Sequence, residues 1–183
     1  MAASYCEYVR QSGADPVHRQ YHDHEYGFPL DDDAALFARL VLEINQAGLS
    51  WEIILKKKDH FFRAFDGFDI DRVARFDERR IERLLLDPGI VRNRLKITSV
   101  IDNARRIQVI REDFGSFKNW LDLHHPMPRE EWVALFRNTF RFTGGEIVQE
   151  FLMSTGYLPG AHVPGCPVYK KLQKIRPAWM RKA

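Results

Sequence analysis

The sequence lacks long apolar runs and contains very few cysteines. No stretch approaches the ~20 consecutive apolar residues that span a bilayer, and the first ten residues, MAASYCEYVR, contain no apolar signal region. We therefore expect a soluble, cytoplasmic protein without a membrane partner. The two cysteines are Cys6 and Cys166. An intracellular compartment disfavours a disulfide between them, so metal binding or free thiols are the expected states.

Internal repeats and low-complexity runs are also absent from the sequence. β-Branched residues seldom alternate with polar ones over the length of a strand, which argues against β-sheets. The 183 residues are 45% hydrophobic and 29% charged, an ordinary mixture for a globular protein of this length. We therefore expect an all-α fold, built as one domain in two lobes that share a core.

The predicted helices are bounded by capping residues and helix breakers. One begins within 31–33 and ends at Gly48, and a second is capped by Ser50 and runs from Trp51 towards Phe65. Further helices are expected from Asp69 or Asp71 through Arg75, from Asp77 to the Pro88-Gly89 break, from about 92 past Ile107, and over 130–140 and 146–155. A Gly- and Pro-rich loop should follow Gly156. The helical domain is expected to span 1–166, before a basic C-terminal tail over 167–183.

The net charge is unevenly distributed along the chain. The formal charge of the whole chain is +3, yet without the six basic residues of the acid-free tail it is −3. These six are Lys170, Lys171, Lys174, Arg176, Arg181 and Lys182. The tail could contact phosphates through counterion release. A lysine-rich end is also often disordered and solubilising, so both roles stay open.

Two cysteine–histidine pairs could bind a metal ion. Fifteen residues separate Cys6 from His22, and three separate His162 from Cys166. Two thiolates and two imidazoles suit a closed tetrahedral zinc site, which would tie the two ends of the chain together and leave no open position for catalysis. Asp23 could orient a histidine from outside the ligand set.

Two other interpretations of these residues remain. The cysteines could be small buried hydrophobic residues, with ordinary histidines nearby. Alternatively, His24 competes with His22 as a ligand, and a catalytic zinc held by His22, Asp23, His24 and Glu25 would make the chain a metallohydrolase.

An acid, an amide and an indole follow one another around the end of the first long helix. Glu43 lies at the edge of the apolar stripe, where a carboxylate is costly without a partner, and Gln46 and Trp51 come next. These groups suit a nucleobase pocket, since a carboxylate accepts from an exocyclic amine and an aromatic face stacks on the base. Tyr21 and Tyr26 could complete the walls. Alternatively, Glu43 pairs with an arginine and Trp51 only fills space.

The segment LLLDPGIVRNR over 84–94 places a Pro-Gly turn between two amphipathic helices and resembles a helix-hairpin-helix. Backbone N–H groups at the start of its second helix could bind a DNA phosphate, aided by the helix dipole. The candidate DNA contacts are Gly89, Ile90, Val91, Arg92, Arg94 and Lys96. The common hairpin pattern has a second glycine where this chain has Val91. An ordinary helix–helix turn with a basic start is the alternative.

Three motifs together resemble the 3-methyladenine DNA glycosylase I family. They are YHDHEYG over 21–27, EINQAGLSW over 43–51 and HVPGC over 162–166, and they occur in the order typical of that family. The resemblance extends from Cys6 to Cys166, and QAGLSW is its most specific part. It implies a helix-hairpin-helix DNA glycosylase fold with a phosphate contact over 89–92. It also implies one structural zinc on Cys6, His22, His162 and Cys166, and a base pocket that includes Glu43, Tyr21 and Trp51.

The activity implied by this resemblance is base excision repair of alkylated DNA. A monofunctional, monomeric enzyme would hydrolyse the N-glycosidic bond of 3-methyladenine in double-stranded DNA of a bacterial nucleoid and leave an abasic site. We expect Glu43 to be the catalytic residue. Because 3-methylation makes the base cationic and a good leaving group, the carboxylate need only accept from its amine and favour the charged base. The alternative is a non-catalytic module that binds alkylated or distorted DNA.

The sequence departs from the family pattern at two pocket positions. The family usually has tryptophan where this chain has Tyr26, and often an aromatic residue where it has His18. Both departures would change the pocket walls. In common with the family, the chain shows no catalytic aspartate downstream of the hairpin and no lysine nucleophile suited to lyase chemistry.

Overall fold

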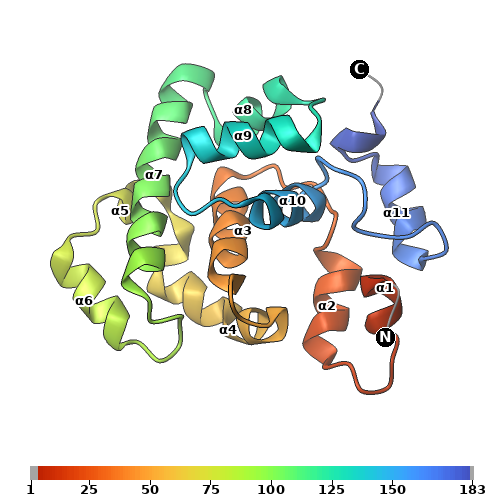
Figure 1. The fold of residues 1–183 in the computed structure, drawn as a ribbon, viewed down its shortest axis with the longest axis horizontal. Coiled ribbons are helices and arrows are strands. Elements are labelled where there is room, and N and C mark those ends of the chain that lie inside the picture. The colour runs from red at the N-terminus through yellow and green to blue at the C-terminus, as the bar shows by residue number, and fades with distance from the viewer. Residues whose placement is uncertain (1–3, 182–183) are drawn as a thin grey trace.

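The computed structural model describes residues 4–181, which form helices and no strand (Figure 1). The α-helices are α1 Tyr5–Tyr8, α2 Pro16–His24, α3 Asp33–Gln46, α4 Trp51–Ala64, α5 Ile70–Ala74, α6 Glu78–Leu86, α7 Arg94–Phe114, α8 Phe117–His124, α9 Arg129–Thr139, α10 Gly145–Ser154 and α11 Pro167–Ile175. Two 3-10 helices, η1 and η2, cover Asp66–Phe68 and Ala178–Met180. The all-α prediction is confirmed. None of the described helices is long and apolar enough to cross a membrane.

Local capping sets where most of the predicted helices begin. Four side chains accept from a backbone N–H in the first turn of α3, α4, α5 and α6, namely Asp32, Ser50, Asp69 and Asp77. After α3, Gly48 adopts φ +81°, a conformation that other residues rarely take. This glycine lets the chain turn directly from α3 into α4.

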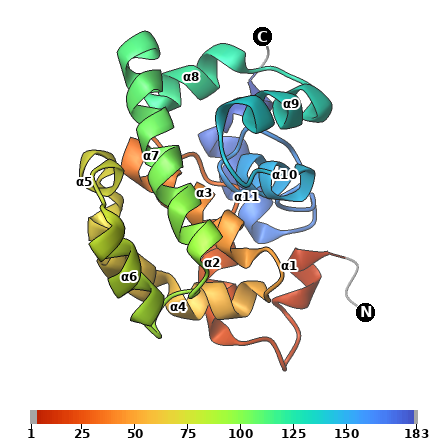
Figure 2. The same ribbon diagram turned by 60° about the vertical axis from the view of Figure 1, so that its left-hand side comes forward.

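Helix α3 lies at the centre of the molecule and contacts α4, α7, α8 and α10 (Figures 1 and 2). Ten of its fourteen residues are buried, including Arg39 and Glu43. A helix buried on nearly all sides has no solvent-facing stripe. Its polar side chains must therefore meet a partner or a cavity.

Segments near the two ends of the described chain lie on the same side of the molecule. Helices α1, α2 and α11 lie together there (Figure 1), and Cys6 and Cys166 pack in one small buried cluster with Val168. This cluster is separate from the main core around α3. The division of the domain into two lobes remains a prediction.

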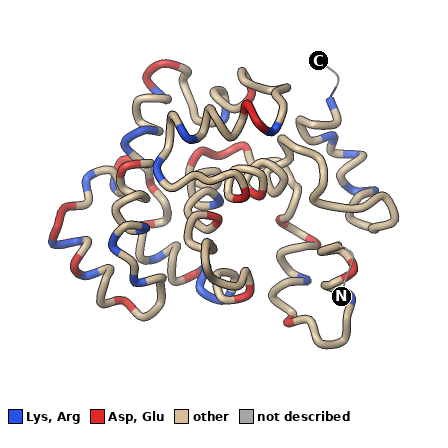
Figure 3. The backbone as a smooth tube through the Cα atoms, in the orientation of Figure 1, with Lys and Arg blue, Asp and Glu red and all other residues tan. Residues whose placement is uncertain are grey.

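Four α-helices of the structure were not among those expected from the sequence: α1, α2, α8 and α11. Helix α8 was not predicted, although Phe117, Trp120 and Leu121 are buried at helical spacing. In the tail, 167–175 forms α11, because Val168 and Leu172 give it a buried apolar face. Lysine and arginine recur along the rest of this segment (Figure 3). Disorder therefore does not apply to 167–181, while Lys182 lies outside the described residues.

Candidate functional site

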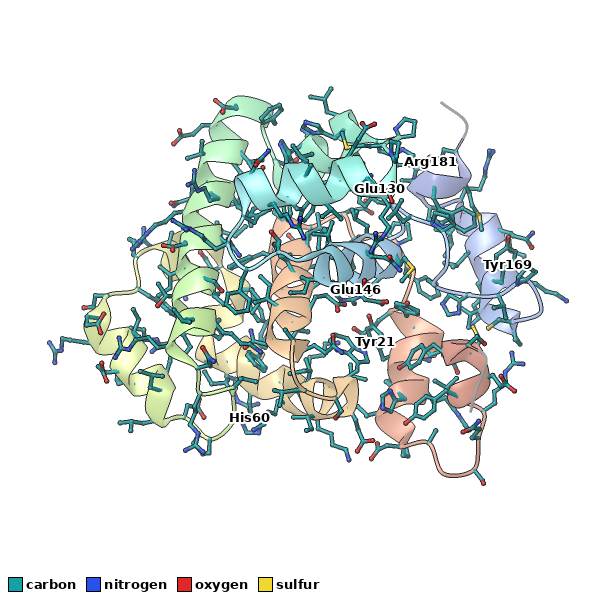
Figure 4. The ribbon with its side chains drawn as sticks, in the orientation of Figure 1. Tyr21, His60, Glu130, Glu146, Tyr169 and Arg181 are labelled. Atoms are coloured by element: carbon teal, nitrogen blue, oxygen red, sulfur yellow. The ribbon has the colours of Figure 1, made fainter. Side chains whose placement is uncertain are left out.

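A cavity of about 460 Å³ opens among α1, α2, α3, α4 and α10. Figure 4 labels two of its lining residues, Tyr21 on α2 and Glu146 on α10. The full lining is Tyr5, Tyr21, Tyr26, Glu43, Gln46, Trp51, Glu146 and Glu150. All five residues predicted for a base pocket thus lie around one space, and three further residues join them.

Aromatic rings form the walls of this cavity. The ring centroids of Tyr21 and Trp51 are 5.2 Å apart at an interplanar angle of 66°, and those of Tyr21 and Tyr26 are 5.5 Å apart. Tyr5 meets the Tyr26 ring edge-on, with centroids 5.4 Å apart. Such a set of rings provides stacking surfaces for a flat aromatic ligand.

His18 lies behind this wall. It is buried, and its Nδ1 is hydrogen-bonded to the Tyr5 hydroxyl at 2.9 Å. The aromatic wall on this side is therefore supplied by Tyr5 and is braced by His18. Sequence reasoning missed Tyr5, although it directly precedes the predicted metal ligand Cys6.

Glu43 is 3% exposed, and no described residue donates a hydrogen bond to its carboxylate or forms an ion pair with it. Burial raises its pKa to about 8, while nearby Arg39 acts in the opposite direction and Glu150 adds to the rise. Arg39 instead donates to the Tyr21 hydroxyl at 3.1 Å and to Glu25 at 3.3 Å. The interpretation of Glu43 as one half of a simple core ion pair is therefore wrong.

Helix α10 contributes two acids that were not predicted. Glu146 and Glu150 are four residues apart, so they share one face of the helix. The Tyr26 hydroxyl donates to Glu150 Oε2 at 3.1 Å. Burial raises the pKa of Glu150, the hydrogen bond from Tyr26 lowers it, and Glu146 raises it further. The i, i+4 spacing of two acids on an otherwise apolar helix is the sequence signal that could have indicated them.

The four predicted metal ligands, Cys6, His22, His162 and Cys166, meet in one buried cluster. Their ligand atoms all lie within 4.8 Å of one another. The Cys6 Sγ is 3.5 Å from His162 Nδ1, and the Cys166 Sγ is 3.6 Å from His22 Nε2 and 3.7 Å from His162 Nδ1. Two thiols and two imidazole nitrogens facing one point could hold a metal ion.

The ring nitrogens that face away from the cluster are also occupied. The His22 Nδ1 lies 2.7 Å from Asp23 Oδ1, as predicted, and His162 Nε2 lies 2.7 Å from the Tyr26 carbonyl oxygen. With the inner nitrogens turned to the sulfurs, the outer ones donate these bonds and fix both rings. Gly27 adopts φ +80°, and a Cβ there would lie 2.8 Å from the Ala161 side chain. This glycine lets the end of α2 approach the loop that carries His162.

The alternative ligand set of a metallohydrolase is not assembled. His24 is exposed, and Glu25 accepts from Lys58 at 2.5 Å and from Arg39. Among residues 4–181, the group that could hold a metal ion contains His22 together with His162 and the two cysteines, and it excludes Asp23, His24 and Glu25. The four residues of that alternative therefore do not converge on one ion.

The Pro-Gly turn joins α6 to α7 through residues 87–93. Its amides are only partly available, because Gly89 N–H donates to Asp87 Oδ1 at 2.7 Å and Ile90 N–H donates to the Asp87 carbonyl oxygen at 3.4 Å. The Ile90 side chain is buried in the core. The backbone N–H groups of Val91 and Arg92 have no acceptor within the described part of the chain. Arg92 is exposed.

Two of the basic residues predicted at this turn have other partners. Lys96 is buried, and its Nζ donates to the carbonyl oxygens of Asn45 at 2.9 Å and Ala47 at 2.6 Å. The prediction that Lys96 contacts DNA is therefore wrong: its ammonium caps the end of α3. Arg94 is exposed but ion-paired with Glu78 and Glu82, which compensate its charge.

A cavity with aromatic walls and a buried carboxylate suits a flipped nucleobase, which is held by stacking and by hydrogen bonds to its edge. The comparisons with known proteins agree. The family model of methyladenine glycosylase matches residues 11–133. The chain is 35% identical to DNA-3-methyladenine glycosylase 1 of Escherichia coli (strain K12), covering 90% of this chain and 96% of that protein. The Haemophilus influenzae DNA-3-methyladenine glycosylase is 30% identical, with 85% and 94% covered.

Solved structures give the same result. The 3-methyladenine DNA glycosylase I of Staphylococcus aureus matches with a TM-score of 0.80 and 33% identity, covering 92% of this chain and 97% of that one. A 3-methyladenine DNA glycosylase I in complex with 3-methyladenine matches with a TM-score of 0.77 and 34% identity, covering 84% and 92%. The chain belongs to the methyladenine glycosylase family, and the family predicted from its motifs is confirmed.

Proposed function

We propose that this chain is a monofunctional DNA glycosylase of base excision repair, which hydrolyses the N-glycosidic bond of 3-methyladenine in alkylated double-stranded DNA. The observation that carries this proposal is the buried Glu43 carboxylate, which faces an aromatic cavity without a hydrogen-bond donor among the described residues. Proteins named for this activity match over 96% and 94% of their own lengths.

The charge of the damaged base explains the role of Glu43. In the empty pocket, burial raises the pKa of Glu43 to about 8, so near neutral pH the carboxyl group mostly keeps its proton. A cationic base beside this buried group favours the ionised carboxylate, because opposite charges attract more strongly away from bulk water. Neutral adenine has no such effect. Glu43 thus accepts from the exocyclic amine of the damaged base and disfavours undamaged DNA.

The remaining steps need little from the protein. The damaged nucleotide flips out of the duplex at a cost of a few kcal/mol, and its base stacks among Tyr21, Tyr26 and Trp51 while Gln46 borders the site. When the N-glycosidic bond breaks, its electron pair moves to the base and neutralises the cation. Water bonds to the sugar carbon and loses a proton, which leaves an abasic site.

We also propose that the four-ligand cluster binds one structural zinc ion. Zn–S and Zn–N bonds of ordinary length at tetrahedral angles place sulfur and nitrogen ligands about 3.6 Å apart. The sulfur–nitrogen distances of 3.5, 3.6 and 3.7 Å support this assignment. Cys6 on α1, His22 on α2, and His162 and Cys166 of the 162–166 loop would hold the ion. The site would thus join these segments and would supply no chemistry to the base pocket.

For DNA binding, we propose that the turn before α7 contacts a phosphate as a helix-hairpin-helix. The amides of Val91 and Arg92 and the exposed Arg92 side chain are the groups free to do so. Such contacts position the duplex without reading its sequence. We expect the protein to act as a monomer in the bacterial cytoplasm.

The decisive experiment is a base-release assay on methylated DNA, with Glu43→Gln and a surface control, Glu112→Gln. We expect the wild-type protein and the control to release free 3-methyladenine at equal rates. Glu43→Gln should be slower by ~10²-fold, the usual effect of removing one electrostatic contact to a transition state. DNA binding without base release would indicate a non-catalytic module instead. An unchanged rate for Glu43→Gln would discard the role of the carboxylate.

A further inference from the structure

Besides Glu43, whose charge Arg39 partly offsets, the cavity has a second carboxylate, Glu150, which no cation among residues 4–181 compensates. Glu150 on α10 is partly buried and accepts from the Tyr26 hydroxyl through Oε2. Within the described part of the chain, Glu150 forms no ion pair and its Oε1 accepts no hydrogen bond. Its neighbour Glu146 differs, since its side chain is 87% exposed and lies 3.3 Å from Arg129.

The charges around the cavity are of one sign. Its lining contains three glutamates and no lysine, arginine or histidine. Arg39 partly offsets the charge of Glu43, but no cation acts on Glu150, whose pKa is raised by burial and by Glu146. A partly buried carboxylate without a cation is unfavourable in the empty pocket. It therefore gains most when a cation enters.

Tyr26 gives this carboxylate a fixed orientation. The ring of Tyr26 is part of the aromatic wall, and its hydroxyl donates its only proton to Glu150. The hydroxyl is therefore not free to donate to a ligand. Tyr26 and Glu150 therefore act together: the hydrogen bond to Oε2 leaves the Oε1 atom of Glu150 as an acceptor for a ligand.

We propose that Glu150, oriented by Tyr26, binds the positively charged base as a second carboxylate and sets the preference of the pocket for cationic over neutral purines. This inference rests on the proposed function, because it takes the ligand to be an alkylated purine cation. An exocyclic amine carries two N–H donors, so Glu43 and Glu150 can each accept one. The added charge strengthens the attraction for a cation and leaves stacking unchanged.

The test measures binding without turnover, using the full-length, zinc-loaded protein. The two probes are 3,9-dimethyladeninium, whose positive charge is permanent, and 9-methyladenine, a neutral purine of similar shape. Isothermal titration calorimetry gives the dissociation constant of each probe. We expect Glu150→Gln to weaken binding of the cation about tenfold, the effect of one charge-assisted hydrogen bond, and to change binding of the neutral purine less than twofold.

Three further variants separate the effect of Glu150 from that of net charge and from that of its orientation by Tyr26. Glu146→Gln removes the same charge one turn away and should weaken cation binding less than threefold, since Glu146 is exposed and paired. Tyr26→Phe keeps the ring, removes the orienting hydroxyl and should weaken cation binding by an intermediate factor. Glu112→Gln, far from the cavity in sequence and exposed, should match the wild type. If Glu150→Gln does not fold, Tyr26→Phe alone decides the question.

Several results would overturn the inference. If Glu150→Gln weakened binding of both probes equally, Glu150 would contribute only to the shape of the pocket. If Glu146→Gln and Glu150→Gln weakened binding of the cation equally, only the net charge would matter. Failure of the proposed function is distinguishable. Wild-type protein that releases no 3-methyladenine but prefers the cation through Glu150 would refute the glycosylase activity only. Base release combined with an unchanged preference in Glu150→Gln would refute this inference only.

Discussion

The cluster of Cys6, His22, His162 and Cys166 and the aromatic cavity, the proposed base pocket, both draw on the same short segment, 21–27. Tyr21 lines the pocket and the next residue, His22, turns into the cluster. Tyr26 serves both, because its carbonyl accepts from His162 while its hydroxyl donates to Glu150. Yet the two sites differ in how their polar groups are satisfied.

In the cluster, the histidine nitrogens that face outward have hydrogen-bond partners and the ligand atoms face one another. In the pocket, Glu43 is buried without a donor among residues 4–181, and its pKa is raised to about 8. A site that stabilises the fold completes its own interactions. A site that acts on a ligand leaves polar groups unsatisfied until the ligand arrives.

The largest predicted effect comes from removing a ligand of the cluster. Cys166→Ser should lose the zinc and lower the midpoint of thermal unfolding by roughly 10 °C or more, because structural zinc contributes strongly to folding. Base release should stay within about threefold of wild type at temperatures where the variant is folded. Calorimetry and the base-release assay measure the two effects. A folded, metal-free variant that releases no base would contradict the prediction that the cluster acts on stability and not on base release.

Because Glu43 is buried without a partner, the free energy of unfolding should depend on pH. Folded Glu43 keeps its proton up to a pKa of about 8, whereas the unfolded carboxyl loses it near 4.5. Between these values the folded state binds more protons, so the free energy of unfolding falls as pH rises, by about 1.4 kcal/mol per pH unit. Urea unfolding from pH 5 to 8 measures this slope.

The matched variant for this slope is Glu43→Gln, which should flatten most of it and become more stable than wild type at pH 8. At pH 4 the two proteins should unfold at similar urea concentrations. An identical slope in both proteins would show that Glu43 is not the unsatisfied group.

Lys96 follows the turn before α7, and its ammonium is bound to the end of α3. Lys96→Met leaves the carbonyl oxygens of Asn45 and Ala47 without their donor, which should cost about 1–3 kcal/mol of stability. The salt dependence of DNA binding should stay the same, because Lys96 is buried and its ammonium is bound to the end of α3. A shallower salt dependence in this variant would restore Lys96 as a phosphate contact.

The smallest effect on stability is expected for Arg92→Ala, which removes an exposed side chain. The free energy of unfolding should change by less than about 0.5 kcal/mol. Titration of DNA binding against salt should give a slope smaller by about one, as expected for one lost phosphate contact. Unchanged binding would place the phosphate contact elsewhere.

Much of the fold was predictable because helix limits are set locally. Asp32, Ser50, Asp69 and Asp77 cap helices that the sequence alone predicts. Helix α11 was not predicted, since the two apolar residues that bury it need a partner that is distant in the chain. The role of Lys96 was wrongly predicted for the same reason: its partner, the end of α3, is distant in the chain, so the local sequence indicates only an exposed cation.

The candidate site was predicted where motifs are contiguous and missed where it draws on separate helices. Glu43, Gln46 and Trp51 stand together in one run, and Tyr21 and Tyr26 in another. Tyr5 and Glu150 come from α1 and α10, and only folding brings them to the cavity. Local sequence also cannot reveal that His18 supports Tyr5 from behind.

The bond from Lys96 to the end of α3 has a geometric consequence for the substrate. It ties the first turn of α7, next to the turn over 87–93, to the chain between Glu43 and Trp51. If the turn binds a phosphate as proposed, that phosphate would stand at a fixed distance from the cavity, and one nucleotide of a bound duplex would be in register with it.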